Sequence, residues 1–234
     1  MRFSVLATDY DNTIASHGRV APTTVEALRR VRESGRRLLL VTGRTSEELQ
    51  QVFPERAIFE RIVAENGALL LDPDNGAERL LGDPIPPRFV AELRRRGVSP
   101  LAVGRGICST LYPHYATVIE AIHDLGLDLR VVFNKGSVMV LPVEVTKASG
   151  TRAVLAELGE MAPAMVAVGD AENDLVFLGM AGCGVAVANA LESVKTRADL
   201  VTVGAAGTGV EELIGELLRD ELRSRLRAAR QKAG

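Results

Sequence analysis

The sequence of 234 residues has no tryptophan, two cysteines, 4% aromatic residues and a net charge of only −2. Cys108 and Cys183 lie far apart and match no metal-binding spacing, which argues against a disulfide or zinc scaffold. We expect both to be buried free thiols in a reducing compartment. The small net charge gives no reason to expect nucleic acid or an anionic membrane surface as a partner.

Long apolar runs and nucleotide-binding loops are also missing. No apolar stretch reaches the roughly 20 residues that a membrane span needs, and no signal-like run opens the chain. We therefore expect a cytoplasmic protein with no membrane partner. Gly104-Arg105-Gly106 lacks the third glycine of a dinucleotide fingerprint, and no phosphate-loop Gly-Lys-Ser/Thr motif occurs, so an NTPase is disfavoured. The three histidines lack ligand spacing and are expected at the surface, at positions 17, 114 and 123.

The sequence does contain an alternation of short apolar runs and amphipathic stretches. The run at 3–8 is followed by a helical pattern that Pro22 opens and Gly35 ends, and a second run occupies 37–41. A capping box then begins another helix at Thr45. Strands and helices that alternate in this way predict an α/β protein with parallel strands and right-handed crossovers.

The same pattern continues further along the chain. A strand at 61–65 ends at Asn66-Gly67, a hairpin signal, and 68–71 continues beyond it. After residue 143 the sequence predicts a helix from Lys147 to about 161, strands at 165–168 and 183–187, and a charged helix at 211–232.

Residues 84–142 differ from what surrounds them. Three prolines between 84 and 87 suggest a linker, and the stretch beyond predicts helices at 88–96 and 116–125 with strands at 101–103, 130–133 and 137–141. Two helices over a small antiparallel sheet would form a separate α+β unit. The predicted division is a core of residues 1–83 and 143–234, with residues 84–142 inserted.

Three of the predicted parallel strands run into loops that contain chemically active side chains. Asp9 and Asp11 follow the first strand, Thr42 follows the second, and Asp170 and Asp174 follow a later one. In an open α/β sheet, ligands bind at the carboxyl ends of the strands. We therefore expect these side chains to converge at one edge of the sheet.

Clustered carboxylates repel one another unless a cation lies among them, and oxygen ligands without His or Cys favour Mg²⁺. Magnesium usually bridges carboxylates to a phosphate. The charge of Lys147 and the hydroxyl of Thr42 suit phosphoryl oxygens. Asp9 is then placed to attack as a nucleophile and form an aspartyl-phosphate. Asp11 could serve as acid to the leaving alcohol and then as base for water.

On these residues the sequence resembles the haloacid dehalogenase superfamily of phosphotransferases. The resemblance rests on Asp9-Tyr10-Asp11-Asn12-Thr13, Val41-Thr42-Gly43-Arg44, Lys147 and Gly169-Asp170-Ala171-Glu172-Asn173-Asp174. Glu65-Asn66-Gly67-Ala68, together with the insert, is similar to the branch that includes Cof-type sugar phosphatases, sucrose-phosphate phosphatase and archaeal phosphoglycolate phosphatase. The resemblance implies a Rossmann-like parallel-sheet core with a small inserted α+β cap.

The resemblance also implies roles for individual residues. Asp9 is the nucleophile, and Asp11 is the acid/base whose backbone carbonyl binds the metal. The implied metal ligands are Asp9, Asp11, Asp170 and Asp174, and the implied phosphate- or substrate-binding groups are Thr42, Gly43, Arg44, Lys147 and Asn173. For Arg44, pairing within the second helix is an equal alternative. Asn66 and Asn173 either orient a neighbour or touch the substrate.

The leading prediction is a magnesium-dependent phosphatase that hydrolyses a small phosphorylated metabolite, as a monomer or homodimer. Two alternatives stay open: a phosphomutase of the same superfamily, and a non-catalytic binding module on the same fold. The complete set of acids argues against the module. The insert is expected to select the ester, and its first residues to consider are Arg105, Ser109, His114 and Lys135.

Overall fold

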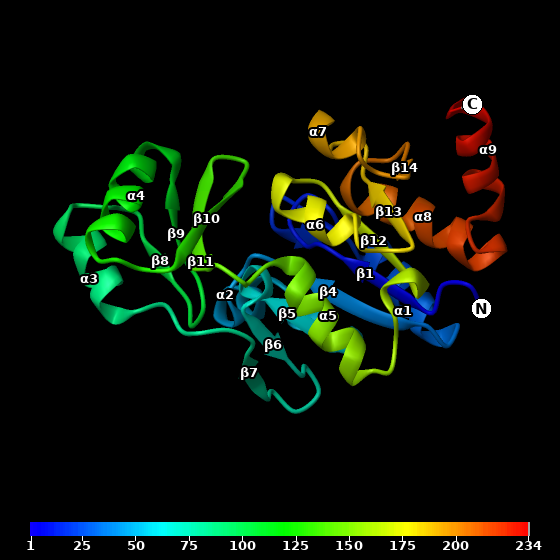
Figure 1. Ribbon diagram of the computed structural model, residues 1–234. Helices are drawn as coiled ribbons and strands as arrows, with labels where there is room; N and C mark the ends of the chain where they lie inside the picture. Colours follow the sequence, from blue (N-terminus) through cyan, green and yellow to red (C-terminus); the bar gives the residue numbers. More distant parts are fainter. Residues whose placement is uncertain (234) are drawn as a thin grey trace.

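Two β-sheets in different parts of the chain organise the structure, a computed structural model that describes residues 1–233 (Figure 1). The larger sheet has the order β14-β13-β12-β1-β4-β5-β6-β7. Its strands from β14 to β5 are parallel, and β6 and β7 add to β5 in antiparallel fashion. The strands are β1 (Val5–Thr8), β4 (Arg37–Val41), β5 (Arg61–Ala64), β6 (Leu69–Leu71), β7 (Glu78–Leu80), β12 (Met165–Gly169), β13 (Cys183–Ala186) and β14 (Leu200–Val201).

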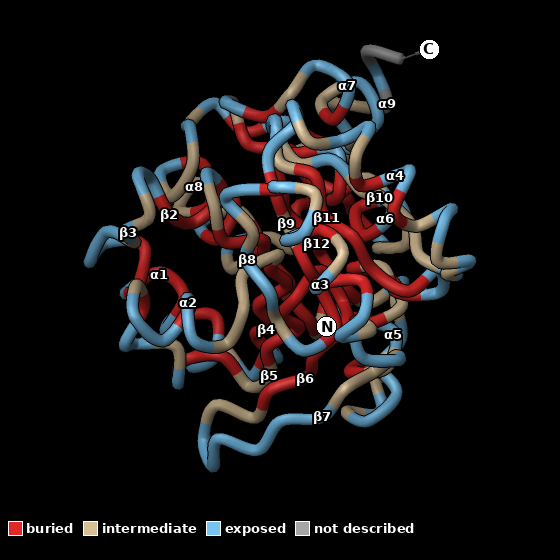
Figure 2. The backbone as a smooth tube through the Cα atoms, turned by 90° about the vertical axis from the view of Figure 1, so that its left-hand side faces the viewer, coloured by how far each residue is buried: buried red, intermediate tan, exposed pale blue. Residues whose placement is uncertain are grey.

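Helices cover both faces of this sheet (Figure 1). Helix α1 packs against α8, and α5 packs against α6. The helices of this part are α1 (Pro22–Glu33), α2 (Ser46–Val52), α5 (Lys147–Glu157), α6 (Leu175–Leu178), α7 (Glu192–Lys195), α8 (Ala206–Asp220) and α9 (Arg223–Ala233), and a short hairpin, β2 (Ala15–Ser16) with β3 (Arg19–Val20), follows β1. The strands run through the buried interior, as Figure 2 shows, because their apolar side chains are covered on both faces.

The second sheet lies in the insert, at the left of Figure 1. It is antiparallel throughout, in the order β10-β11-β9-β8. Its elements are α3 (Pro87–Arg95), β8 (Ala102–Val103), β9 (Cys108–Leu111), α4 (Tyr115–Asp124), β10 (Leu129–Asn134) and β11 (Ser137–Pro142). The insert has a hydrophobic cluster of its own, which includes the fully buried Phe89, Leu93 and Val118. The α/β class and the α+β character of the insert are as predicted; the boundaries at 83/84 and 142/143 stay predictions.

A third, smaller apolar cluster joins the two parts. It contains Ala68 from the start of the β5–β6 hairpin, Ile107, Met139 and Leu141 from the insert, and Val145 from the chain that returns. The insert is therefore packed against the core at a junction of its own, in addition to the two chain connections.

Several elements differ from the sequence prediction. The charged C-terminal helix is two helices, because Glu221 and Leu222 adopt left-handed conformations with φ 57° and 61°. Leu222 is fully buried there, and Asp220 accepts a hydrogen bond from the backbone N–H of Ser224 at 3.2 Å. Helix α5 ends at Glu157 instead of near 161, since Gly159 turns the chain with φ 68°.

The strand β9 was not predicted at all. It is short and mixes polar and apolar residues, so neither a buried run nor a clear alternation marks it. The hairpin signal at Asn66-Gly67 is confirmed, because β5 and β6 pair antiparallel across it.

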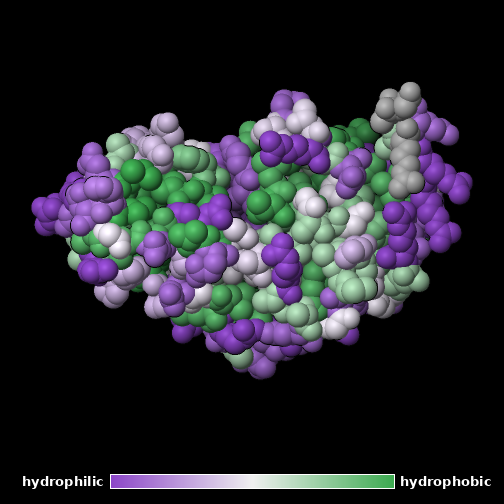
Figure 3. Space-filling model, viewed as in Figure 1, coloured by the Kyte–Doolittle hydropathy of each residue, from purple (hydrophilic) through white to green (hydrophobic). Residues whose placement is uncertain are grey.

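Among residues 1–233, no helix is long and apolar enough to cross a membrane. Helix α9 has arginines along much of its length, and the side of the molecule that contains it is largely hydrophilic (Figure 3). Both cysteines are buried and free, as predicted.

Candidate active site

The site forms where the central strands of the larger sheet end. β1 lies between β12 and β4, and Thr8 pairs with Val168, so the residues that follow the two strands are neighbours. Asp9 continues this register by donating its backbone N–H to the carbonyl of Val168 at 2.9 Å. Its side chain and that of Asp170 therefore reach the same point of the sheet edge, as the sequence predicts.

Lys147 joins the acids from the first turn of α5. Its Nζ lies 2.5 Å from Oδ1 of Asp9 and 2.6 Å from Oδ1 of Asp174. The helix begins at this place because the hydroxyl of Thr146 caps it, accepting the backbone N–H of Ser149 at 2.9 Å. Gly67 permits the close approach: a Cβ there would lie 2.0 Å from the carbonyl oxygen of Thr146.

Asp174 shapes the loop that contains Asp170. Its Oδ2 accepts the backbone N–H groups of Asp170 at 2.9 Å and Ala171 at 3.0 Å, while its Oδ1 accepts from Lys147. Both carboxylate oxygens are thus engaged within the protein. The loop is held by these bonds, and Oδ1 of Asp170 also accepts from the hydroxyl of Thr13 at 3.3 Å.

Burial dominates the electrostatics of this cluster. Burial raises the pKa of Asp9 to about 8, although Lys147 acts in the opposite direction. Burial also raises the pKa of Asp170 above its ordinary value. For Lys147, burial lowers the pKa, but the carboxylates of Asp174 and Asp9 outweigh it, so that its pKa is raised and its charge is retained.

The donor set fits a hard divalent cation. One carboxylate oxygen from each of Asp9, Asp170 and Asp174 lies within 4.8 Å of the others, and all three residues are buried. Three carboxylates face two ammonium groups, the buried one of Lys147 and the partly exposed one of Lys135 at Asp170, so the cluster can accept further positive charge. Oxygen ligands of this kind suit Mg²⁺ better than a soft metal.

The loop after β4 supplies Thr42, Gly43 and Arg44. Thr42 is fully buried, and its hydroxyl oxygen accepts the backbone N–H of Arg44 at 3.1 Å, which leaves its proton available to a ligand. Arg44 binds Asp11 in a bidentate pair, with Nε and Nη2 each 2.7 Å from a carboxylate oxygen. The guanidinium also lies over the ring of Tyr10, 5.3 Å from its centroid.

Asn173 lies at the buried side of the site. Its Nδ2 donates to Oδ1 of Asn66 at 3.0 Å, so the two asparagines named by the sequence are paired. The Oδ1 of Asn173 is buried and has no hydrogen-bond partner within the part of the chain that the structure describes. An acceptor in this state is ready to bind a donor supplied by a ligand or a water molecule.

A pocket of about 390 Å³ adjoins the acid cluster at Asp9, and both parts of the protein line it. Its core wall consists of Asp9, Asp11, Asn12, Gly43, Arg44 and Glu48, and its insert wall of Ser109, Asn134, Lys135, Ser137 and Met139. The sequence named Ser109 and Lys135 among its candidates in the insert. Arg105 instead pairs with Glu78, and His114 bonds the backbone of Ser99.

Glu65 links the core to the insert, a role that the sequence did not predict. It is fully buried and adopts φ 50°, and its carboxylate accepts the backbone N–H groups of Arg105 at 3.1 Å and Gly106 at 2.6 Å. Burial raises its pKa. Gly104 leaves room for it, since a Cβ there would lie 2.6 Å from Oε1 of Glu65. The Gly-Arg-Gly sequence thus fastens the insert to the core.

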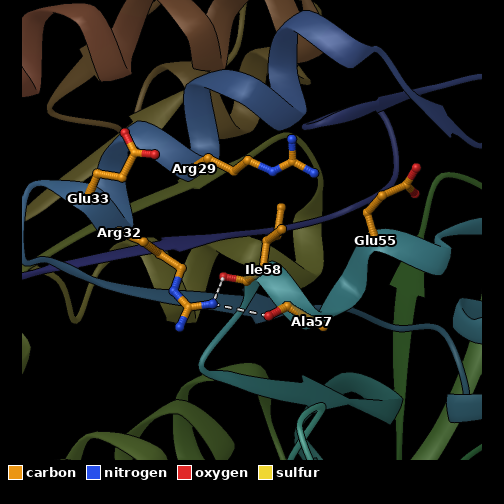
Figure 4. Close-up of a pocket in the computed structure, with 6 residues that line it drawn as sticks. All are labelled: Arg29, Arg32, Glu33, Glu55, Ala57 and Ile58. Atoms are coloured by element: carbon orange, nitrogen blue, oxygen red, sulfur yellow. Dashed lines mark hydrogen bonds between the residues drawn. The ribbon is translucent and has the colours of Figure 1, made fainter.

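A hollow of about 410 Å³ lies elsewhere, between α1 and the 3-10 helix at Pro54–Ile58 (Figure 4). The guanidinium of Arg32 points to the carbonyls of Ala57 and Ile58 there, and Nη1 donates to them at 3.1 and 3.2 Å. The hollow adjoins the last turn of α1, which precedes β4, so it lies away from the carboxyl ends of the strands. Its charged groups include two acids and two arginines, with no cluster of reactive groups.

The fold is α/β, and it places a buried cluster of carboxylates with a lysine at the carboxyl edge of a parallel sheet. The chain belongs to the family of haloacid dehalogenase-like hydrolases, whose sequence pattern it matches over residues 6–95 and 113–214.

Individual proteins support this membership. The chain is 32% identical over 219 residues to a phosphoglycolate phosphatase of Methanothermobacter thermautotrophicus, a match that covers 89% of this chain and 96% of the relative. A haloacid dehalogenase-like hydrolase from Bacteroides thetaiotaomicron has the same fold, with a TM-score of 0.79 at 21% identity over 92% of this chain and 99% of that one. A sugar phosphatase of HAD subclass IIB superposes with a TM-score of 0.73 at 19% identity, covering 92% of this chain and 98% of that one.

Proposed function

We propose that the protein is a magnesium-dependent phosphatase that works through a phosphoryl group carried on Asp9. The observation that supports this most strongly is the buried cluster of Asp9, Asp170 and Asp174 around Lys147. Lys147 holds the carboxylate of Asp9 in place at the end of a central strand. Its positive charge also balances negative charge that develops beside Asp9 during an attack.

In the first step, a carboxylate oxygen of Asp9 attacks phosphorus, and the bond from phosphorus to the ester oxygen breaks. The leaving alcohol takes a proton from Asp11. In the second step, Asp11 removes a proton from water, which attacks phosphorus, and the bond to Asp9 breaks to release inorganic phosphate. Lys147 and the hydroxyl of Thr42 hold phosphoryl oxygens throughout.

Asp11 must part from Arg44 to do this. In the bidentate pair, both oxygens of Asp11 accept hydrogen bonds from Arg44, so the carboxyl group is not free to exchange a proton with the leaving alcohol. A phosphate dianion in the pocket competes with Asp11 for the guanidinium. We propose that Arg44 transfers at least one of its bonds to the substrate, which releases Asp11 for proton transfer.

The metal would be held by the carboxylates of Asp9 and Asp170 and by the backbone carbonyl of Asp11. Asp174 would act through water, because its two oxygens already accept bonds from Lys147 and from the loop amides. When bound, Mg²⁺ supplies positive charge that offsets the repulsion between the carboxylates and a phosphate dianion.

Phosphoglycolate is the first substrate to test, since relatives that match nearly the whole chain are phosphoglycolate phosphatases. The pocket of about 390 Å³, whose lining is mostly polar, has room for an ester of this size. The assay measures phosphate release from 2-phosphoglycolate and from p-nitrophenyl phosphate with Mg²⁺ and without a bisphosphate activator. Release is the expected result; no release from either ester would overturn the proposal, and release only with the activator would indicate a mutase.

A further inference from the structure

The insert places one ammonium group inside the acid cluster. Lys135 contacts Oδ2 of Asp170 through Nζ, although the two residues belong to different parts of the protein. Asp170 is 2% exposed and Lys135 is 30% exposed, so the lysine reaches from the open pocket towards a buried carboxylate. Its backbone N–H also lies 3.5 Å from Oε2 of Glu172.

A rigid turn aims this side chain. Lys135 and Gly136 form the two-residue loop between β10 and β11, where Asn134 pairs with Ser137, and both have positive φ, 44° and 92°. This is the pattern of a type I′ hairpin turn, which fixes the direction of its residues. The carbonyl of Gly136 also accepts the backbone N–H of Tyr112 at 2.9 Å. A lysine in the left-handed region is uncommon, and such residues gather at functional sites.

Lys135 cannot keep this contact when a divalent cation is present. A metal held by Asp170 places positive charge next to the ammonium, and like charges at this separation repel one another strongly in a partly buried site. Metal and ammonium also compete for the carboxylate of Asp170. The side chain of Lys135 is long and partly exposed in the pocket, so it can turn away from Asp170 while the backbone of Lys135 stays in place.

The two cations that line the pocket lie on opposite walls. Of the cations that line the pocket, Arg44 lies on the core wall and binds Asp11, whereas Lys135 lies on the insert wall. The same wall contains the hydroxyl and amide groups of Ser109, Asn134 and Ser137, beside the apolar Met139. A point charge with three donors among small polar groups suits a compact anion.

We propose that Lys135 selects the substrate by pairing with a carboxylate on the leaving group, so that the preferred substrate class is phosphorylated hydroxy acids. The inference rests on the proposed function and adds the residue that recognises the leaving group. It assigns Lys135 two partners: Asp170 when the metal is absent, and the carboxylate of the substrate when the metal is bound.

The test compares two esters that differ in one group. 2-Phosphoglycolate has a carboxylate where 2-hydroxyethyl phosphate has a neutral hydroxymethyl group. Wild-type protein should prefer 2-phosphoglycolate. Lys135→Met keeps the length of the side chain without its charge and should lower kcat/KM for 2-phosphoglycolate about 10- to 100-fold, mainly through KM. It should change kcat/KM for 2-hydroxyethyl phosphate less than about threefold.

A second readout does not depend on turnover. Calorimetric titration should show that Lys135→Met binds Mg²⁺ several-fold more tightly than the wild type, because the ammonium no longer competes for Asp170. Arg105→Met is the matched control: it removes another cation of the insert, one that pairs with Glu78 outside the pocket. It should alter neither the preference between esters nor the affinity for Mg²⁺.

The outcomes separate the two proposals. If the wild type hydrolyses neither ester, the proposed function is wrong. If it hydrolyses both, and Lys135→Met slows both equally or leaves the preference and the Mg²⁺ affinity unchanged, the function stands and the role of Lys135 is wrong.

Discussion

The acid cluster of the core and the insert wall of the pocket are built in opposite ways. On the core side, the charged groups of the cluster are buried and bound to one another: Lys147 is 1% exposed and lies between Asp9 and Asp174. On the insert side, Lys135 is 30% exposed and sits on a two-residue turn. Buried, mutually bound groups keep one geometry for every substrate, whereas exposed side chains can change partners. This difference supports the proposal that the core carries out the reaction and that the insert selects the ester.

Replacing Asp9, the proposed nucleophile, should have the largest effect on turnover. Asp9→Asn keeps the shape of the side chain, but the amide is a far poorer nucleophile, so kcat should fall about a thousandfold or more on any ester. The variant should remain folded, which circular dichroism and a thermal melt can check. Residual turnover above about one per cent of wild type would argue against covalent catalysis at this residue.

Removing the metal should abolish activity on every ester alike. EDTA leaves Asp9, Asp170 and Asp174 facing a phosphate dianion with Lys147 as their buried cation. Added Mg²⁺ should restore turnover and raise Tm, because a ligand that binds the folded state alone stabilises it. Full activity in exhaustively chelated protein would contradict the account.

Substitutions of Lys147, the buried cation of the acid cluster, should lower both stability and turnover. Lys147→Ala leaves two carboxylates buried without their partner, at a cost of about 3–5 kcal/mol in the free energy of unfolding, together with loss of turnover. Lys147→Arg keeps the charge, but a guanidinium is wider and flatter than an ammonium, so we expect partial rescue only. Denaturant unfolding and kcat measure the two effects. If Lys147→Arg matches wild type, the site needs only charge there.

The smallest effect is expected from removing the two hydrogen bonds by which Glu65 joins the core to the insert. Glu65→Ala leaves the backbone N–H groups of Arg105 and Gly106 without their acceptor, which should cost about 1–3 kcal/mol. Hydrogen exchange at these amides should speed up, and activity should fall to a similar extent on both esters. Glu78→Ala, which removes an exposed partner of Arg105, is the control and should have little effect. Unchanged exchange in Glu65→Ala would show that the insert is fastened elsewhere.

The core could be predicted from the sequence because its signals are local. Buried apolar strands that are followed directly by Asp9 and Asp170 predict both the sheet and the edge at which its acids lie, and the capping box at Thr45 predicts a helix start. The parallel topology then brings the loops together by necessity. The acids and Lys147 meet for this reason, although their roles in binding and catalysis stay predictions until they are measured.

The rest depends on contacts between segments far apart in sequence. No sequence pattern predicts that Glu65 binds the backbone of the Gly-Arg-Gly stretch, or that Lys135 contacts Asp170. The bidentate pair of Arg44 with Asp11 was likewise not predicted, because the topology brings the two loops together without showing which side chains pair. Left-handed residues at Glu221 and Leu222 divide the last helix without any glycine or proline to signal it.

The most direct test of the account is to trap the phosphoryl group during turnover. Wild-type protein and Lys135→Met are each mixed with Mg²⁺ and saturating 2-phosphoglycolate, quenched in the steady state, reduced with borohydride and analysed by peptide mass spectrometry. An acyl phosphate is reduced to the alcohol, so the account predicts reduction at position 9 in both proteins and none without substrate. Reduction at a different acid, or an unmodified Asp9 in protein that is turning over, would contradict it.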